Sequence, residues 1–193
     1  NIWCDVEEFL AAVSRISDHD HTDTMLCDEC RIDLEAAIQL YRGDFLAGFG
    51  LKDSENFDDW QFFQTETLRQ NLANALESVT RYSIETGDYR DAGTYARKWL
   101  SLDPMNEAAH RCLMRIAAWT GNRGAAVRQY RDCVRILDDE LGVEPHESTR
   151  TLFETISNKE LTAAVHHKVS EATGATETSA DTYDAQSGSA RQS

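Results

Sequence analysis

Apolar residues recur three and four positions apart along most of the chain, which is the period of an amphipathic α-helix. The first such stretch covers residues 5–13, with Asp5 as its N-cap and Glu8 three residues later. A second stretch runs from about Asp28 to Tyr41 and ends at Gly43, a residue typical of helix C-termini. No β-rich run with the strand period of two occurs. The pattern therefore predicts an all-α fold.

A long third helix is predicted next, and Asn56 or Asp58 can cap its N-terminus. Its inward stripe is predicted to consist of Trp60, Phe63, Leu68, Leu72, Leu76 and Val79. The segment GDFLAGFG before this helix is predicted to form a turn. We expect the apolar side chains of that turn to pack into the core, namely Phe45, Leu46 and Phe49.

An internal repeat is the most informative feature of the pattern. TGDYRDAGTYARKWLSLDP starts at Thr86, and TGNRGAAVRQYRDCVRILDD starts 34 residues later at Thr120. Gly87 and its counterpart Gly121 allow tight reversals between antiparallel helices, and Ala92 and its counterpart Ala126 allow close helix packing. A glycine turn at this period resembles the tetratricopeptide repeat. The first helices lack the usual Trp and Gly of that repeat, which favours a compact, tetratricopeptide-like hairpin bundle of about seven helices over an open array.

The last part of the chain changes in character. Gly142 ends one predicted helix, and Pro145 lies near the first turn of the last one. Residues 170–193 contain no Leu, Ile, Val, Phe or Trp and are rich in Ser, Thr, Ala and Gly. Such a segment buries too little apolar surface to offset its ordering entropy. We therefore expect a helical domain over residues 1–167 and a disordered tail over residues 168–193.

The charge of the chain is strongly negative and uneven. The net charge is −15, and residues 1–60 contain fifteen acids and four bases. Residues 107–135 contain two acids and six arginines. An acidic chain repels phosphate backbones, so we do not expect it to bind nucleic acid unaided.

Composition and cysteine usage also limit the class of protein. No apolar run approaches the roughly 20 residues that span a bilayer, so no membrane partner is expected. The first residues do not resemble a signal peptide, and they lack an initiator Met, which suggests a piece of a longer protein. Five irregularly spaced cysteines argue against a disulfide framework and favour a reducing cytoplasm.

Several segments together resemble a known family. They are IWCDVEEF, LEAAIQLYRGDFLAGF, the Trp of DDW, and LDPMNEAAHRCLMRIAAWTGNRGAAVRQYRDCVRILDDELGVEP. In order and spacing they resemble the bacterial transcriptional activator domain, the helical module of SARP-type regulators, over about residues 2–160. In that family a winged-helix DNA-binding domain precedes this module, and none is present in this chain.

The resemblance implies transcriptional regulation by the parent protein. The DNA would be bound only through the missing N-terminal domain, and this module would contact protein. Its expected partners are a second copy, the adjacent winged-helix domain or RNA polymerase components. The alternative is a stand-alone tetratricopeptide-like scaffold that binds a peptide or an effector. No phosphate loop and no hydrolase or metalloprotease motif occurs, so we do not expect an enzyme.

One short segment carries candidate metal ligands. His19, His21, Cys27 and Cys30 lie within DHDHTDTMLCDEC, and the two cysteines have the spacing of a zinc half-knuckle. They precede a predicted helix, whose N-terminal dipole favours thiolates. Four such ligands would make a closed, structural zinc site with no position open for catalysis. A metal-free polar loop and a redox-active cysteine pair remain alternatives.

The candidate contact residues are five arginines on two predicted helices, Arg111, Arg115, Arg128, Arg131 and Arg135. Three interpretations remain open at this level. The arginines could form salt bridges to the acidic first third of the chain, contact a partner protein, or contact phosphate in support of the missing DNA-binding domain. Cys112 and Cys133 lie on apolar helix faces and are expected to be ordinary core residues.

Overall fold

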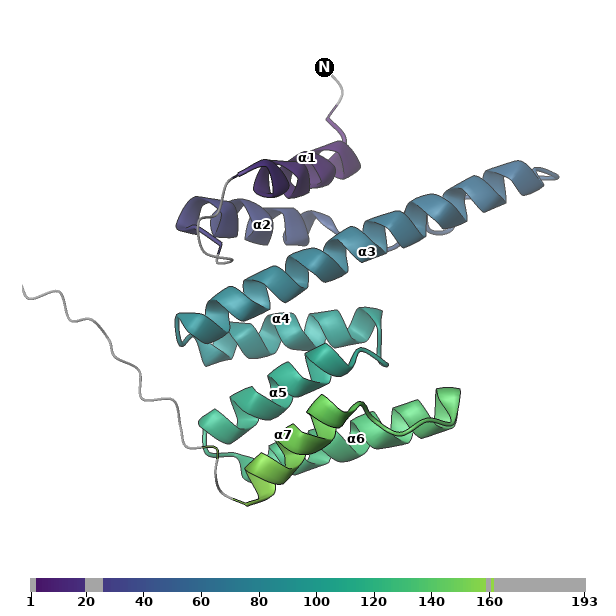
Figure 1. Cartoon of the computed structure of the whole chain (residues 1–193). Helices are drawn as coiled ribbons and strands as arrows, with labels where there is room; N and C mark the ends of the chain where they lie inside the picture. The colour runs from purple at the N-terminus through teal and green to yellow at the C-terminus, as the bar shows by residue number, and fades with distance from the viewer. Residues whose placement is uncertain (1–2, 20–25, 159–160, 162–193) are drawn as a thin grey trace, which may run out of the picture.

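The computed structural model describes residues 3–19, 26–158 and 161, and this part of the chain is all-α. Its seven helices are α1 (Asp5–Asp18), α2 (Asp28–Leu40), α3 (Glu55–Glu85), α4 (Tyr89–Leu102), α5 (Glu107–Trp119), α6 (Arg123–Leu141) and α7 (Glu147–Ser157). The predicted all-α bundle of helical hairpins is confirmed (Figure 1). The tail predicted over residues 168–193 lies outside the described residues.

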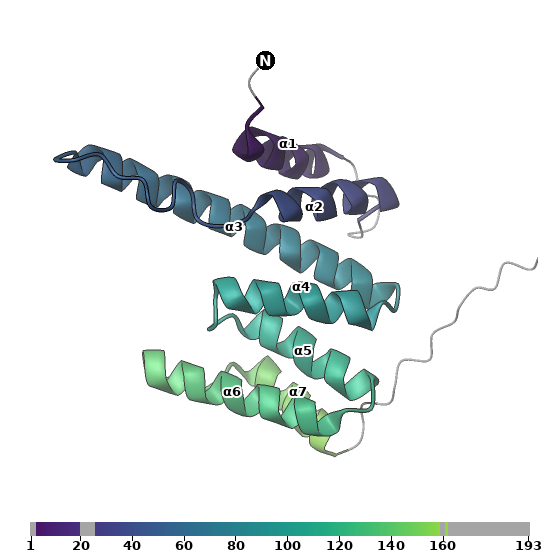
Figure 2. The ribbon, with the colours of Figure 1, turned by 180° about the vertical axis from the view of Figure 1, so that it is seen from behind.

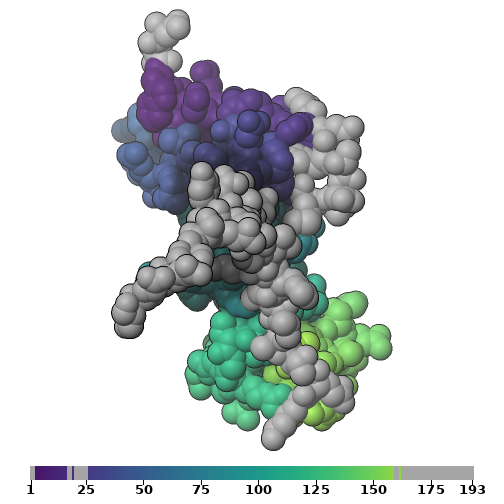
Figure 3. All heavy atoms as spheres, turned by 90° about the vertical axis from the view of Figure 1, so that its left-hand side faces the viewer, coloured from purple at the N-terminus to yellow at the C-terminus, as the bar shows by residue number. Residues whose placement is uncertain are grey.

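The helices are stacked in the order of the chain. Each helix from α1 to α7 packs against the next, and further contacts join α1 to α3, α3 to α5, and α5 to α7. The result is an elongated stack with α1 at one end and the α6–α7 pair at the other (Figures 1 and 2). The space-filling view shows the same order, from the purple N-terminal helices to the green and yellow C-terminal ones (Figure 3).

The two predicted glycine turns connect α3 to α4 and α5 to α6. Gly87 has a φ of +81° and Gly121 a φ of +79°, a region that a residue with a Cβ occupies only with strain. The residue after each glycine caps the next helix: the side chain of Asp88 accepts a hydrogen bond from the N–H of Asp91, and that of Asn122 from the N–H of Ala125. Each reversal is therefore complete within a few residues.

The buried residues form one core around α3 and a second one between α5, α6 and α7. Leu72, Leu76 and Val79 on the C-terminal half of α3 are fully buried, in contact with the inner faces of α1, α2 and α4. Met114 and Ile156 centre the second core. Ala92 and Ala126 are both fully buried, as close helix packing requires.

The expectation for the start of α3 and the turn before it was wrong in part. Trp60 and Phe63 were predicted to face inward, yet 46% and 65% of their surface is exposed. Leu46 and Phe49 of the preceding turn are 40% and 53% exposed, and only Phe45 packs against the core. The start of α3 projects past the ends of the neighbouring helices (Figures 1 and 2), and Trp60 and Phe63 on this part of α3 are exposed. The helix also begins at Glu55, ahead of both predicted caps.

A polar network fastens α7 to α5. The Thr149 hydroxyl is fully buried, donates to Glu107 Oε2 at 2.6 Å and accepts from Arg111 Nη1 at 3.0 Å. Both carboxylate oxygens of Glu107 also accept from the backbone N–H of His146, just before α7. Buried polar groups that are satisfied in this way hold the two helices in one register.

Candidate functional site

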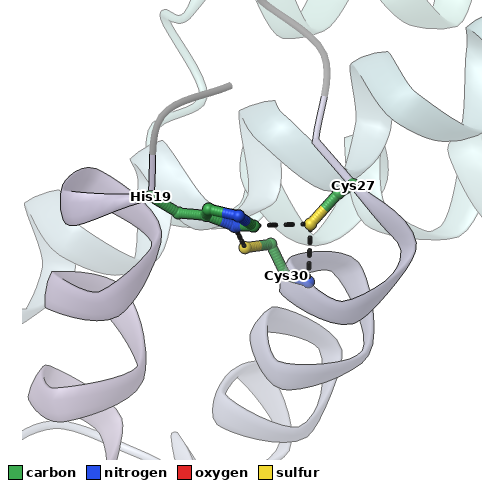
Figure 4. A group of neighbouring side chains, drawn as sticks. All are labelled: His19, Cys27 and Cys30. Atoms are coloured by element: carbon green, nitrogen blue, oxygen red, sulfur yellow. Dashed lines mark hydrogen bonds between the residues drawn. The ribbon is translucent and has the colours of Figure 1, made fainter. Parts of the chain in front are cut away.

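Three of the four predicted metal ligands meet between α1 and α2. His19 is the residue that ends α1, Cys27 is the N-cap of α2, and Cys30 lies in the first turn of α2. His19 Nδ1 lies 3.0 Å from Cys30 Sγ and 3.5 Å from Cys27 Sγ (Figure 4). All three donor atoms lie within 4.8 Å of one another. The fourth predicted ligand, His21, lies outside the described residues.

The start of α2 determines where the two thiols lie. Cys27 has the extended backbone of an N-cap, and its sulfur accepts from the N–H of Cys30 at 3.4 Å. The N–H of Arg31 donates to the carbonyl of Cys27 at 2.9 Å and starts the helical ladder. A Cys-x-x-Cys sequence at a helix N-terminus therefore brings both sulfurs to the same end of α2, facing α1 (Figure 4).

Contacts to α3 hold the first turn of α2, which contains the two cysteines, in place. The Tyr82 hydroxyl donates a hydrogen bond to the carboxylate of Asp28, between the two cysteines. The Arg31 guanidinium lies over the Tyr82 ring, 5.5 Å from its centroid, and pairs with Glu35 at 2.6 Å. The cysteine turn is thus attached to the body of the stack by residues that are not themselves candidate ligands.

Burial and charge keep the Cys30 thiol protonated when no cation is near. Cys30 is only 7% exposed. Burial, with contributions from Cys27, Asp33 and Glu29, raises the pKa of the Cys30 thiol to about 11. At Cys30, burial and the neighbouring acids therefore outweigh the helix N-terminus. A bound cation would supply the missing charge.

The donor set and its spacing fit a metal. Two thiol sulfurs and one imidazole nitrogen are soft and intermediate ligands, which suit zinc better than calcium or magnesium. Zn–S and Zn–N bonds of roughly 2.3 and 2.0 Å in a tetrahedron place ligand atoms about 3.5–3.8 Å apart. The observed separations of 3.0 and 3.5 Å are close to that geometry. The cluster could hold a metal ion.

The five candidate arginines lie in the second half of the stack and do not form one site. Arg111 is half-buried and serves the Thr149 network, whereas Arg115, Arg128, Arg131 and Arg135 are exposed. Among the described residues, the one ion pair of this set joins Arg135 to Asp139 on the same helix, at 3.4 Å. The described part of the chain therefore gives no support to salt bridges between these arginines and the acidic first third.

An exposed aromatic surface was missed by the sequence analysis. We call it the aromatic tip and define it as Phe49, Leu51, Trp60, Phe62 and Phe63, which are 46–65% exposed. Edge-to-face contacts consolidate it, including Phe45 with Trp60 at 5.4 Å and Phe62 with Phe63 at 5.8 Å. The signal was present in FDDWQFF, because apolar residues there fall on both faces of the helix.

Comparison with known families assigns the class of protein. The sequence matches the bacterial transcriptional activator domain (BTAD) over residues 4–157. The chain belongs to this family, a regulatory and non-catalytic one found in bacterial transcriptional activators. A search of curated proteins gave no match. In the described part of the chain, no helix is both long enough and apolar enough to cross a membrane.

Proposed function

We propose that this chain is the regulatory and protein-interaction module of a bacterial transcriptional regulator. The observation that carries the proposal is the BTAD match over residues 4–157. The module contributes dimerisation or contact with the transcription machinery, while a separate winged-helix domain of the parent protein binds DNA. The net charge of −15 supports this division of labour, because an acidic surface repels the DNA backbone.

The aromatic tip is the first contact surface in this proposal. Exposed aromatic side chains that lie next to one another are typical of interface hot spots, because they bury large areas at little entropic cost. Phe62 and Phe63, the most exposed of them, lie on the projecting half of α3, where a partner can approach from several sides. The exposed arginines of α6 are the second surface, since arginine is also enriched at interfaces.

Two further features of the proposal concern chemistry and compartment. The protein is not an enzyme, and its candidate metal centre has a structural role with zinc as the metal. The odd number and irregular spacing of the five cysteines support a reducing cytoplasmic location.

A cavity supports the alternative of an effector-binding scaffold. Its volume is about 500 Å³, and it lies between the start of α1, the end of α2, the turn that follows α2 and the middle of α3, lined mainly by apolar residues such as Phe9, Leu40, Phe45 and Leu68. This size and lining suit a small apolar ligand. An effector bound there would contact the turn that leads to the aromatic tip, so regulation by a ligand and contact with a protein are compatible.

The contact surfaces can be tested in a reporter strain that expresses the complete parent regulator. We expect the double variant Phe62→Ser and Phe63→Ser to lose about tenfold in activation, since one hot spot contributes more than 1 kcal/mol to binding. The double charge reversal Arg128→Glu and Arg131→Glu tests the second surface in the same way. The matching 193-residue variants should keep the wild-type Tm, because exposed substitutions change stability by less than about 0.5 kcal/mol.

Two matched controls make this experiment specific. Leu141→Ser with Val143→Ser removes exposed apolar residues elsewhere, and Arg81→Glu with Arg90→Glu reverses two exposed arginines outside the candidate set. Both controls should activate normally. Normal activation by both test variants, at normal protein levels, would refute protein contact through these surfaces.

A further inference from the structure

The convergence of His19, Cys27 and Cys30 leads to a specific metal site. We propose that these three residues bind one zinc ion that fastens the end of α1 to the start of α2. The inference deepens the structural part of the proposed function. It does not depend on the regulatory part, because zinc content is measured without any partner.

The first argument is the meeting of donors from separate segments. His19 lies eight residues before Cys27 and eleven before Cys30, yet its Nδ1 approaches both sulfurs. The three donors come from two helices and point toward one another (Figure 4). A polar loop that collects such residues by chance has no reason to direct all three donor atoms to one point.

The second argument is the balance of charge. Binding converts two thiols to thiolates and releases two protons, so Zn²⁺ with two thiolates and one neutral imidazole has no net charge. The neighbouring carboxylates of Asp28, Glu29 and Asp33 make a cation favourable at this end of α2.

The third argument is preorganisation of the cysteine turn. The hydrogen bond from Tyr82 to Asp28 and the placement of Arg31 over the Tyr82 ring attach this turn to α3 without using a ligand atom. Both thiols are therefore placed before a metal binds. Zinc would join His19, at the end of α1, to this pair of thiols and close the loop between the helices.

The ligand set can be tested by metal analysis of the untagged 193-residue protein purified under reducing conditions. We expect about one zinc per chain in the wild type. Cys27→Ser and His19→Ala should each lower zinc affinity at least about tenfold, a conservative loss for the removal of a ligand. The matched control Cys4→Ser should retain the full zinc content, because Cys4 does not belong to the donor group.

A second measurement keeps the inference testable if a variant fails to fold. Wild-type apoprotein should take up one cobalt ion per chain, with the intense visible absorption of tetrahedral cobalt bound to thiolates. Chelation should lower the Tm of the wild type and leave that of Cys27→Ser unchanged. A protein without stoichiometric zinc that takes up no cobalt overturns the proposal. A Cys27–Cys30 disulfide in that protein would assign the pair a redox role instead.

Discussion

The two ends of the stack are closed in different ways. At the α5–α6 turn, Thr120 is the C-cap of α5, Gly121 has a positive φ, and Asn122 is the N-cap of α6. The contact between Glu107 and the buried Thr149 then holds α7 in place. The connection from α1 to α2 runs from His19 to Cys27, has no glycine, and brings together candidate metal ligands instead.

This difference shows how one repeat architecture can use two kinds of fastening. Local backbone geometry is sufficient where the turn is three residues long. A longer connection has a higher closure entropy and gains more from a link between its ends. The α5–α7 end should therefore be insensitive to metal, whereas the α1–α2 end should depend on it.

The largest effect is expected from breaking the polar fastening of α7. Thr149→Val keeps the shape of a fully buried side chain and removes both hydrogen bonds of its hydroxyl, so we expect a loss of about 1–3 kcal/mol in the free energy of unfolding. Urea unfolding measures it, and Thr151→Val on the exposed side of α7 is the control. The loss should be equal with zinc and with a chelator, because distant sites contribute additively. A metal-dependent loss would contradict the separation of the two ends.

A smaller effect is expected at the glycine turn. Gly121→Ala forces a Cβ into a φ of +79° and should destabilise the protein by about 1–2 kcal/mol. Gly124→Ala is the matched change three residues later in α6, where an added Cβ meets the flexible end of the Arg128 side chain at 3.4 Å and Asn122 Oδ1 at an ordinary contact distance of 3.9 Å. It should stabilise the protein by up to about 1 kcal/mol through helix propensity. Thermal unfolding should show shifts of opposite sign, and an unchanged or raised Tm for Gly121→Ala would show that this turn does not depend on the glycine.

The smallest effect is expected at Asp44, in the segment between α2 and α3. Arg69 donates two hydrogen bonds to the Asp44 carboxylate and lowers the pKa of that carboxyl below its ordinary value of 3.8. A lowered pKa in the folded state contributes stability above the ordinary pKa, and that contribution is lost as the pH falls through the folded value. Because both side chains are more than 40% exposed, Asp44→Asn should cost less than about 1 kcal/mol near pH 7 and nothing in strong acid. Urea unfolding of the wild type and the variant, near pH 7 and in strong acid, measures this cost. An equal loss of stability under both conditions would mean that the Arg69–Asp44 ion pair does not cause it.

The sequence predicted the parts of the fold that depend on neighbours along the chain. Gly87, Gly121, Ala92 and Ala126 all serve the roles that their spacing implied, because turn geometry and close helix contact are local requirements. The convergence of His19 with the two cysteines was also predicted, since one short loop contains all of them.

The parts that depend on the length and position of other elements were not predictable. The helical period of α3 gave an inward face but not the point where its neighbours end, so Trp60 and Phe63 were wrongly assigned to the core. The Glu107–Thr149 contact joins residues 42 positions apart and leaves no periodic trace in the sequence. The place of His21 in the metal site stays a prediction.

The projecting half of α3 has a mechanical consequence. A continuous helix of 31 residues is a stiff rod about 46 Å long. Its buried half packs against α2 and against α4. A force applied at Phe62 or Phe63 would therefore be carried along α3 to its contacts with α2 and α4 in the centre of the stack.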